Sequence, residues 1–223
     1  MWSVPTSISI SCTLYIYTIT SPQRGNLLVL LRLFRYLDSW LYRNTRLAKL
    51  DAADGPYTAI ILAAAGLQRL GCGSRITTFL GPPILFPAVG QAALGVEIRL
   101  DDPRVAKIVS TISHWRTEWT CRGERACLRV LEGGCSVPVG ISSNLTGELS
   151  GEKTLQMTCT VTALDGSFQV EQTVEGVVNS GEDAEGLGKR LAGLLIEHGA
   201  GRVLDDVKRD REAKQAETQA ATK

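Results

Sequence analysis

A repeated alternation of apolar and polar residues in the second half of the chain most constrains its fold. Two runs, 137–141 and 155–161, place apolar side chains at every second position, and a third run returns through 168–174. Successive side chains of a β-strand point to opposite faces, so each run predicts a strand with one buried face. Asp165-Gly166 separates the second and third runs and is a strong signal for a tight hairpin. The sequence therefore predicts a three-stranded antiparallel sheet.

Helical patterns flank these strands. Asp102-Pro103 combines an N-cap side chain with a first-turn proline and predicts the start of one helix. A second helix is predicted over 117–131. A third runs over 183–198, where apolar residues recur at helical spacing, and Gly199 ends it. Together with the sheet, these helices predict a small α+β domain that can fold on its own.

The preceding part of the chain has a different pattern. The apolar run 58–63 predicts a short buried strand, and 64–70 begins a helix that Gly71 ends. A second extended segment is predicted around 94–98. The final residues, 208–223, are charged and contain Ala and Gln, so we expect a disordered tail.

Composition excludes several classes of protein. A net charge of +1 over 223 residues gives no case for binding nucleic acid through the whole chain. Six cysteines without a CxxC pair predict neither a disulfide framework nor a metal site, and they fit reduced thiols in the cytoplasm. Residues 27–37 form an amphipathic pattern that suits a membrane surface, although Arg32 and Arg35 argue against a transmembrane helix.

A single thiol lies on a glycine turn between the second helix and the first strand. Residues 132–140 read EGGCSVPVG, with Cys135 directly after Gly133-Gly134. The two glycines permit positive φ and leave no side chains to shield the sulfur, so a bulky group could be attached there. The spacing alone favours a helix C-cap followed by an incidental cysteine.

Five segments together resemble one enzyme family. They occur in the family's order, and the resemblance extends from about residue 44 to about residue 207. The segments are NTRLAKLD at 44–51, AIILAAAGLQRLG at 59–71, PAVGQAALGVE at 87–97, GERA at 123–126 and EGGCSVPV at 132–139. They are similar to motifs of porphobilinogen deaminase, also called hydroxymethylbilane synthase.

The resemblance implies a fold, a cofactor and a reaction. The expected fold is a partial α/β, periplasmic-binding-protein-like region followed by the α+β domain. In the family a cysteine, here Cys135, carries a dipyrromethane through a thioether. Four porphobilinogen molecules then condense on it stepwise with loss of ammonia, in haem and tetrapyrrole biosynthesis. Arg24, Arg46 and Arg69 match family positions that bind pyrrole carboxylates, and no metal is implied.

Two departures from the family concern the N-terminal half. Arg24-Gly25-Asn26-Leu27 resembles the start of a motif whose end is at 44–46, and the intervening residues 28–43 match nothing in the family. We interpret them as translated intron or a faulty gene model; a genuine loop insertion is the alternative, because loop closure entropy grows slowly with length. Residues 1–23 do not resemble the family's first domain, which supplies the catalytic aspartate, so we expect no catalytic residue in this chain.

These observations divide the chain and leave three interpretations. Residues 24–109 are expected to be a remnant of the substrate-binding domains and 110–207 the cofactor-attachment domain. In the first interpretation, which the resemblance implies, the protein is expected to be a transferase of the family that acts as a cytoplasmic monomer on porphobilinogen and the growing polypyrrole, although the chain as written is expected to be inactive. Alternatively it is a non-catalytic remnant whose C-terminal domain binds a pyrrole. A more distant alternative is a peripheral membrane protein that uses residues 27–41.

Two single residues also depart from the family pattern. Ala92 occupies a position where the family usually has glycine, and a side chain there costs roughly 1 kcal/mol or more if the backbone needs positive φ. Gly123 stands where alanine is usual and is expected to loosen its helix by about 1 kcal/mol.

Overall fold

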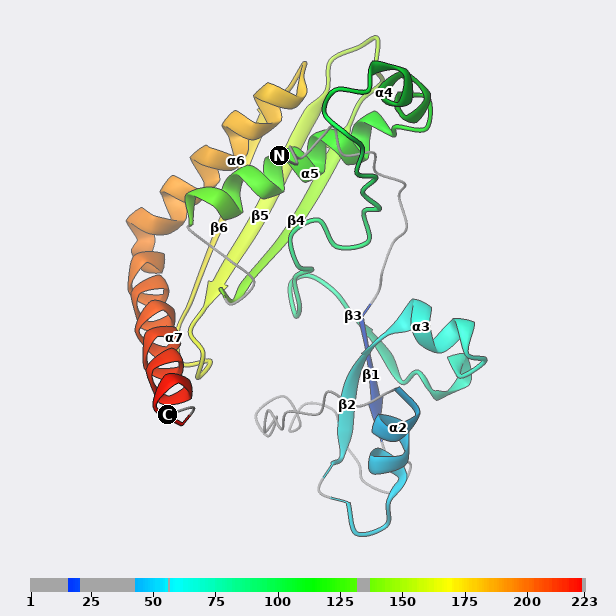
Figure 1. The fold of residues 1–223 in the computed structure, drawn as a ribbon, viewed down its shortest axis with the longest axis vertical. Helices are drawn as coiled ribbons and strands as arrows, with labels where there is room; N and C mark the ends of the chain where they lie inside the picture. Colours follow the sequence, from blue (N-terminus) through cyan, green and yellow to red (C-terminus); the bar gives the residue numbers. More distant parts are fainter. Residues whose placement is uncertain (1–15, 21–42, 56, 132–136, 222–223) are drawn as a thin grey trace. The chain divides into compact units, whose positions relative to one another are not determined.

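The computed structural model describes residues 16–20, 43–55, 57–131 and 137–221. These residues belong to two compact units (Figure 1). The small unit is Thr13–Ile84, and the large unit contains Leu85–Lys223. Each is described by itself below.

The small unit is built on a three-stranded antiparallel sheet. Strand β1 (Ile16–Thr20) lies between β2 (Ala59–Ala63) and β3 (Thr78–Leu80). Helices α2 (Arg43–Asp51) and α3 (Ala64–Arg69) contribute to a core with β2. The buried residues of this core are Leu47, Leu50, Ile60, Leu62 and Leu67.

The strand and helix predicted over 58–70 are confirmed. Helix α3 ends because Gly71 adopts a φ of 70°, which a residue with a Cβ rarely does. The amide of Cys72 donates to the carbonyl of Leu67 (2.8 Å) and that of Gly71 to the carbonyl of Gln68 (3.0 Å). This pair of bonds is a Schellman cap, which satisfies carbonyls that the helix end leaves unpaired.

The large unit contains the predicted antiparallel sheet, in the order β4-β5-β6. Its strands are β4 (Val139–Thr146), β5 (Thr154–Thr162) and β6 (Gln169–Val177). Ile141 pairs with Cys159 and Met157 with Val174, as the alternation requires. The predicted hairpin is confirmed too: Gly166 has a φ of 72°, and the Ala163 amide donates to the Phe168 carbonyl (2.8 Å).

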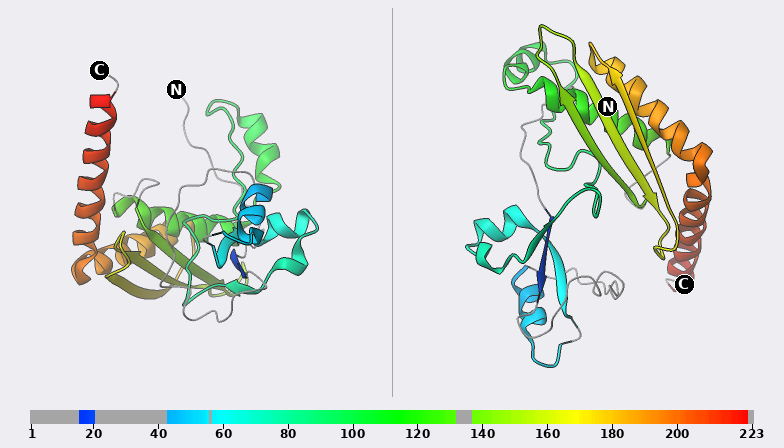
Figure 2. Two further views of the ribbon diagram at one scale, coloured as in Figure 1. Left: turned by 90° about the horizontal axis from the view of Figure 1, so that it is seen from below. Right: turned by 180° about the vertical axis from the view of Figure 1, so that it is seen from behind.

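Two helices cover one face of this sheet, as Figures 1 and 2 show. They are α5 (Trp115–Val130) and α6 (Gly181–Leu195). The core between helices and sheet includes Leu155, Met157, Cys159, Val161, Leu191 and Leu195, each with no exposed surface. On the opposite face, polar side chains bond across the strands: Gln156 donates to Glu175 (2.9 Å), and Thr158 bonds to Thr173 (2.9 Å).

Side chains at the predicted positions mark the helix ends. Helix α4 (Pro103–Ser110) is capped by Asp102, whose carboxylate accepts from the Val105 amide (3.0 Å). Helix α6 begins with Ser180, which accepts from the Asp183 amide (3.1 Å). At its other end a π-turn, Ile196–Ala200, leads into α7 (Gly201–Ala221), and Gly199 at this kink has a φ of 104°. The prediction that a glycine ends the helix there is confirmed.

Two predictions about the chain between and after these elements are wrong. Residues 94–98 form no strand, and Leu94 is exposed, because no described strand lies beside them to pair with. The tail 208–223 was expected to be disordered, yet α7 continues to Ala221. Its Ala, Lys, Glu, Gln and Arg residues are good helix formers, and they extend a helix that buried Val203 and Val207 anchor on the core.

None of the helices among the described residues combines the length and the apolar character that a membrane crossing requires. The amphipathic segment 27–41 lies outside the described residues. No disulfide joins the four cysteines of the described residues.

Candidate functional site

Arg46 is held against the sheet of the small unit by the helix that carries it. The neighbouring Leu47 and Leu50 bury α2 in the core, with 8% and 1% of their surface exposed. The half-buried Arg46 then donates from Nη2 to the carbonyl of Ile61 on β2 (3.2 Å). Among the described residues this is the one hydrogen bond of the side chain, and it uses a fraction of the guanidinium's five donors, so the fork has donors for an anion.

Arg69 is exposed at the end of α3, two residues after the fully buried Leu67. Its guanidinium makes no hydrogen bond or ion pair with any residue that the structure describes. Because α2 and α3 contribute to the same core, the structure brings Arg46 and Arg69 into one small unit.

A third arginine of this unit has a different environment. Arg75 donates twice to the carboxylate of Asp51, over 2.6 and 3.2 Å. This bidentate pair ties the 3₁₀ turn Gly73–Arg75 to the end of α2. Sequence reasoning singled out neither partner for this role, because residues 24 positions apart give no local signal of contact.

The other two predicted site residues, Cys135 and Arg24, lie outside the described residues. The described neighbours of the cysteine segment are part of the large unit. Leu131 at the end of α5 is 1% exposed, and Val137 contacts the same core. The Pro138 carbonyl accepts from the Thr162 amide (3.1 Å), so the chain after the cysteine joins the sheet directly.

Residues 87–93, which carry the PAVGQA motif, are attached to the rest of the large unit at several points. The Ile141 amide of β4 donates to the Pro87 carbonyl (2.8 Å), and the Gly90 amide donates to the Glu124 carboxylate of α5 (2.7 Å). Val89 contacts the core. This segment is therefore bound to α5 and β4, the two elements that precede and follow residues 132–136.

Glu124 is the residue of this site that sequence reasoning missed. Burial raises the pKa of its carboxyl group. The Gly90 amide, the nearby Ser143 hydroxyl and the Arg125 charge favour the ionised form and lower that pKa in part. A glutamate on the sheet-facing side of an otherwise amphipathic helix is the signal that could have identified it.

Two thiols lie near the same carboxyl group. Cys127 and Cys159 have no exposed surface. Contact with Cys127 and burial raise the pKa of Cys159 far above its ordinary value, and the Glu124 charge adds to the effect. Cys159 therefore stays protonated, and since the thiolate is the nucleophilic form, this buried cysteine is inert.

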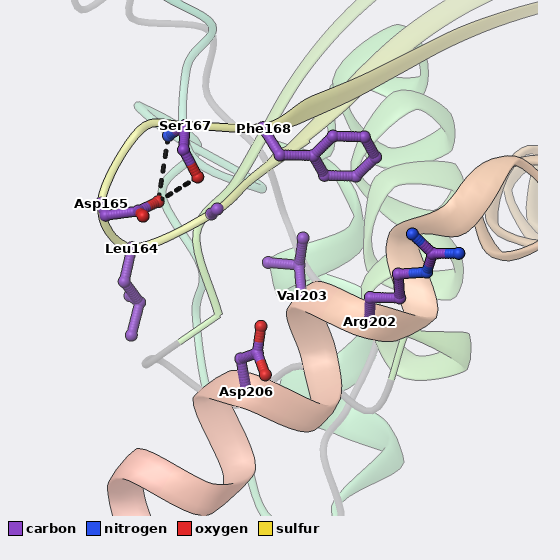
Figure 3. A pocket seen from close by; sticks show the side chains of 8 residues that line it. Leu164, Asp165, Ser167, Phe168, Arg202, Val203 and Asp206 are labelled. Carbon is purple, nitrogen blue, oxygen red and sulfur yellow. Dashed lines mark hydrogen bonds between the residues drawn. The ribbon is translucent and has the colours of Figure 1, made fainter.

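A cavity of about 440 Å³ lies elsewhere on the large unit, between the β5–β6 hairpin and α7 (Figure 3). Phe168 and Val203 supply apolar surface, and Asp165 accepts from the amide (3.0 Å) and hydroxyl (2.6 Å) of Ser167. These two bonds lower the pKa of Asp165. Of the predicted site residues, the two that the structure describes, Arg46 and Arg69, do not line the cavity.

Comparison with known proteins places both parts of the chain in one family. Residues 20–107 match the domain model described as "Porphobilinogen deaminase, dipyromethane cofactor binding domain", and residues 119–197 match the C-terminal domain of the same enzyme. Arg24, Arg46 and Arg69 fall within the first match and Cys135 within the second.

Curated relatives give the same result. The chain is 46% identical over 164 residues to a porphobilinogen deaminase of Nostoc sp.. The aligned region covers 74% of this chain and 48% of the relative. It is 37% identical over 182 residues to that of Schizosaccharomyces pombe (82% and 54%) and 42% identical over 168 residues to that of Saccharomyces cerevisiae (75% and 50%).

The two matched domains, in this order, are those of a family of transferases. The chain belongs to the porphobilinogen deaminase family. It spans about half the length of the curated relatives it matches.

Proposed function

We propose that the protein acts in tetrapyrrole biosynthesis as a porphobilinogen deaminase, in which four porphobilinogen molecules condense stepwise on a dipyrromethane bound to Cys135. The presence of both family domains in one chain, with Cys135 in the second and three candidate arginines in the first, supports this proposal.

The described residues fit such a cofactor. Each pyrrole ring carries an acetate and a propionate, so the site must supply fixed cations. Arg46 keeps donors beyond the one that binds the Ile61 carbonyl, and the exposed Arg69 guanidinium has no partner among the described residues. A guanidinium binds carboxylate bidentately and does not lose its proton, which suits both residues to this task.

Each proposed residue has a distinct role. The thiolate of Cys135 forms the thioether once and afterwards serves as a tether, which makes later encounters effectively intramolecular. Arg24, Arg46 and Arg69 bind the carboxylates. The bound dipyrromethane supplies the pyrrole carbon from which the chain grows.

We place this activity in the cytoplasm and propose a monomer. In this proposal, the small unit belongs to an α/β, periplasmic-binding-protein-like part of the family fold, and residues 110–207 are the domain that carries the cofactor.

The self-contained core of the large unit favours a second candidate function. In that case the chain is a non-catalytic module that holds a pyrrole on Cys135. The two candidates share the cofactor and differ in turnover, so release of hydroxymethylbilane from added porphobilinogen separates them.

A colour test with Ehrlich's reagent on the purified protein tests the common step. We expect the wild type to give the reaction of a bound dipyrromethane and Cys135→Ser to give none. Cys72→Ser, which removes a partly exposed thiol outside the cysteine segment, should react like the wild type. Colour on the Cys135→Ser protein would refute the assignment.

A further inference from the structure

The segment 87–93 is fixed by its contacts with the large unit. Besides the bond from the Ile141 amide to Pro87, its main anchor is the bond from the Gly90 amide to Glu124. Inside the segment, the Gln91 side chain accepts from the Ala88 amide (2.8 Å). Gly90 and Ala92 both have left-handed backbones, with φ of 67° and 72°. A loop with this backbone needs outside contacts to stay in one conformation.

Holding the segment with the Glu124 carboxylate carries a cost in hydration free energy. The half-buried carboxylate of Glu124 loses hydration that few neighbours restore, and a neutral side chain of similar size would avoid that loss. The Ser143 hydroxyl lies near the carboxyl but makes no well-aligned hydrogen bond among the described residues. The Gly90 amide therefore provides the shortest hydrogen bond that the group receives, at 2.7 Å.

We propose that Glu124 is a positioning residue whose carboxylate holds the segment 87–93 on the large unit through the Gly90 amide, so that docking of the segment depends on the ionisation of this one side chain. The segment is bound to α5 and β4, which precede and follow the residues around Cys135 in the chain. The docking itself does not rest on the proposed function; only its effect on cofactor attachment does.

Ionisation of Glu124 has opposite effects on the segment and on the whole unit. The bond to the Gly90 amide is charge-assisted and strengthens when the carboxyl loses its proton. Because burial raises the pKa, however, ionisation lowers the stability of the folded unit. As the pH rises through that pKa, the segment docks more tightly while this group's contribution to global stability falls. If the Glu124 carboxyl group acted on global stability alone, docking of the segment and the group's contribution to global stability would change with pH in the same direction.

Among the groups that face one another here, Glu124 is the one whose ionisation we propose controls docking of the segment. Arg125 on its own helix keeps its charge, as a guanidinium does at any pH in this range. Cys127 on α5 and Cys159 on β5 are buried thiols, and Cys159 stays protonated. Ser143 on β4 and the Gly90 amide are neutral donors.

Amide hydrogen exchange followed by NMR on the whole chain tests the proposal. In the wild type, protection of the Gly90 amide should rise with pH after correction for intrinsic exchange, while protection of globally exchanging core amides such as Met157 should fall relative to that in Glu124→Gln. In Glu124→Gln the Gly90 amide should lose roughly tenfold or more of its protection and its pH dependence. The Ile141 amide is the internal reference and should stay protected.

Glu118→Gln is the matched control, because Glu118 lies on the same helix and accepts from Ser113 (3.2 Å) instead of from the segment. It should leave Gly90 protection unchanged. The proposal is overturned if Gly90 in Glu124→Gln is as protected as in the wild type. It is also overturned if protection of the Gly90 amide in the wild type falls as the pH rises through the raised pKa of Glu124, a result that needs no variant to fold.

Cofactor attachment provides the functional measurement. The pH profile of dipyrromethane attachment to Cys135 should flatten in Glu124→Gln and remain in Glu118→Gln. An attachment profile in Glu124→Gln identical to that of the wild type contradicts the positioning role. If the wild type takes up no cofactor, the proposed function fails, and Gly90 exchange alone decides the inference.

Discussion

Ala92 has a φ of 72°, the only positive φ of a non-glycine residue among those the structure describes. The sequence predicted an energetic cost at position 92 if the backbone there has a positive φ, and the structure shows that it has. The left-handed backbone costs an L-residue roughly 1–2 kcal/mol. Glycine removes this cost but raises the entropy of the unfolded chain, which offsets part of the gain in stability. We expect Ala92→Gly to raise the free energy of unfolding by about 1 kcal/mol in urea titrations.

The neighbouring alanine provides the control for this substitution. Ala93 lies one position further and has no positive φ. Ala93→Gly should therefore lower the stability by about 0.5–1 kcal/mol through chain entropy alone. Equal effects of the two substitutions would contradict the account of Ala92.

Glu124 predicts a specific pH dependence of stability. Its pKa is raised in the folded state, so the folded protein binds the proton more tightly than the unfolded chain does. The resulting stabilisation is complete below the ordinary pKa of 4.5 and is lost as the pH rises through the raised value. Relative to Glu124→Gln, the wild type should therefore lose stability over this range. Urea titrations at several pH values measure the difference, and a constant difference would refute this sign.

At the scale of elements, α5 and α6 touch at two glycines. A Cβ at Gly188 would lie 2.0 Å from the carbonyl oxygen of Gly123, so the helices would have to separate. A Cβ at Gly123 would lie 3.0 Å from the Ala184 carbonyl oxygen and 3.1 Å from the Met157 sulfur. Gly123 is expected to loosen its own helix. It also allows α5 to contact α6 closely, and the Cβ of an alanine would disturb that contact.

We expect Gly188→Ala to lower the free energy of unfolding by about 3 kcal/mol, because overpacking forces backbone shifts. Gly186 lies two residues earlier on α6, with no atom within 4 Å of its added Cβ. Gly186→Ala should instead raise stability by up to about 1 kcal/mol through helix propensity. Similar effects at the two positions, in thermal or urea unfolding, would show that α5 and α6 do not meet at Gly188.

Local signals predicted several elements correctly. The alternation in β4, β5 and β6, the Asp165-Gly166 hairpin and the glycines at 71 and 199 act through neighbouring residues, which a sequence displays. The strand expected at 94–98 was wrong because a strand needs a partner that the sequence does not reveal.

The contacts that build the candidate site are non-local. The bond between Gly90 and Glu124 joins residues 34 positions apart, and that between Arg46 and Ile61 joins residues 15 apart. Resemblance to the family identified Arg46, Arg69 and Cys135 as candidates, but neither spacing nor periodicity could show what each guanidinium contacts. The half-buried Glu124 was missed for the same reason.

At the scale of the whole molecule, the large unit has a core of its own. Its helices α5 and α6 and its sheet bury a continuous cluster that includes Leu131, Ile141 and Leu155. We expect residues 85–223, produced alone, to unfold cooperatively in urea, with near-UV circular dichroism and fluorescence giving one transition. Separate transitions, or a protein that lacks near-UV signal before denaturant is added, would contradict an independent core.

The central claim is that this chain carries a pyrrole cofactor on one cysteine. Peptide mapping by mass spectrometry of the whole chain, produced in cells that make porphobilinogen and alkylated after reduction, tests it most directly. The account predicts that the peptide with Cys135 carries two linked pyrroles through a bond that reduction does not break, while the peptides with Cys72 and Cys159 are alkylated. A Cys135 peptide that is fully alkylated, or an adduct on another cysteine, would contradict it.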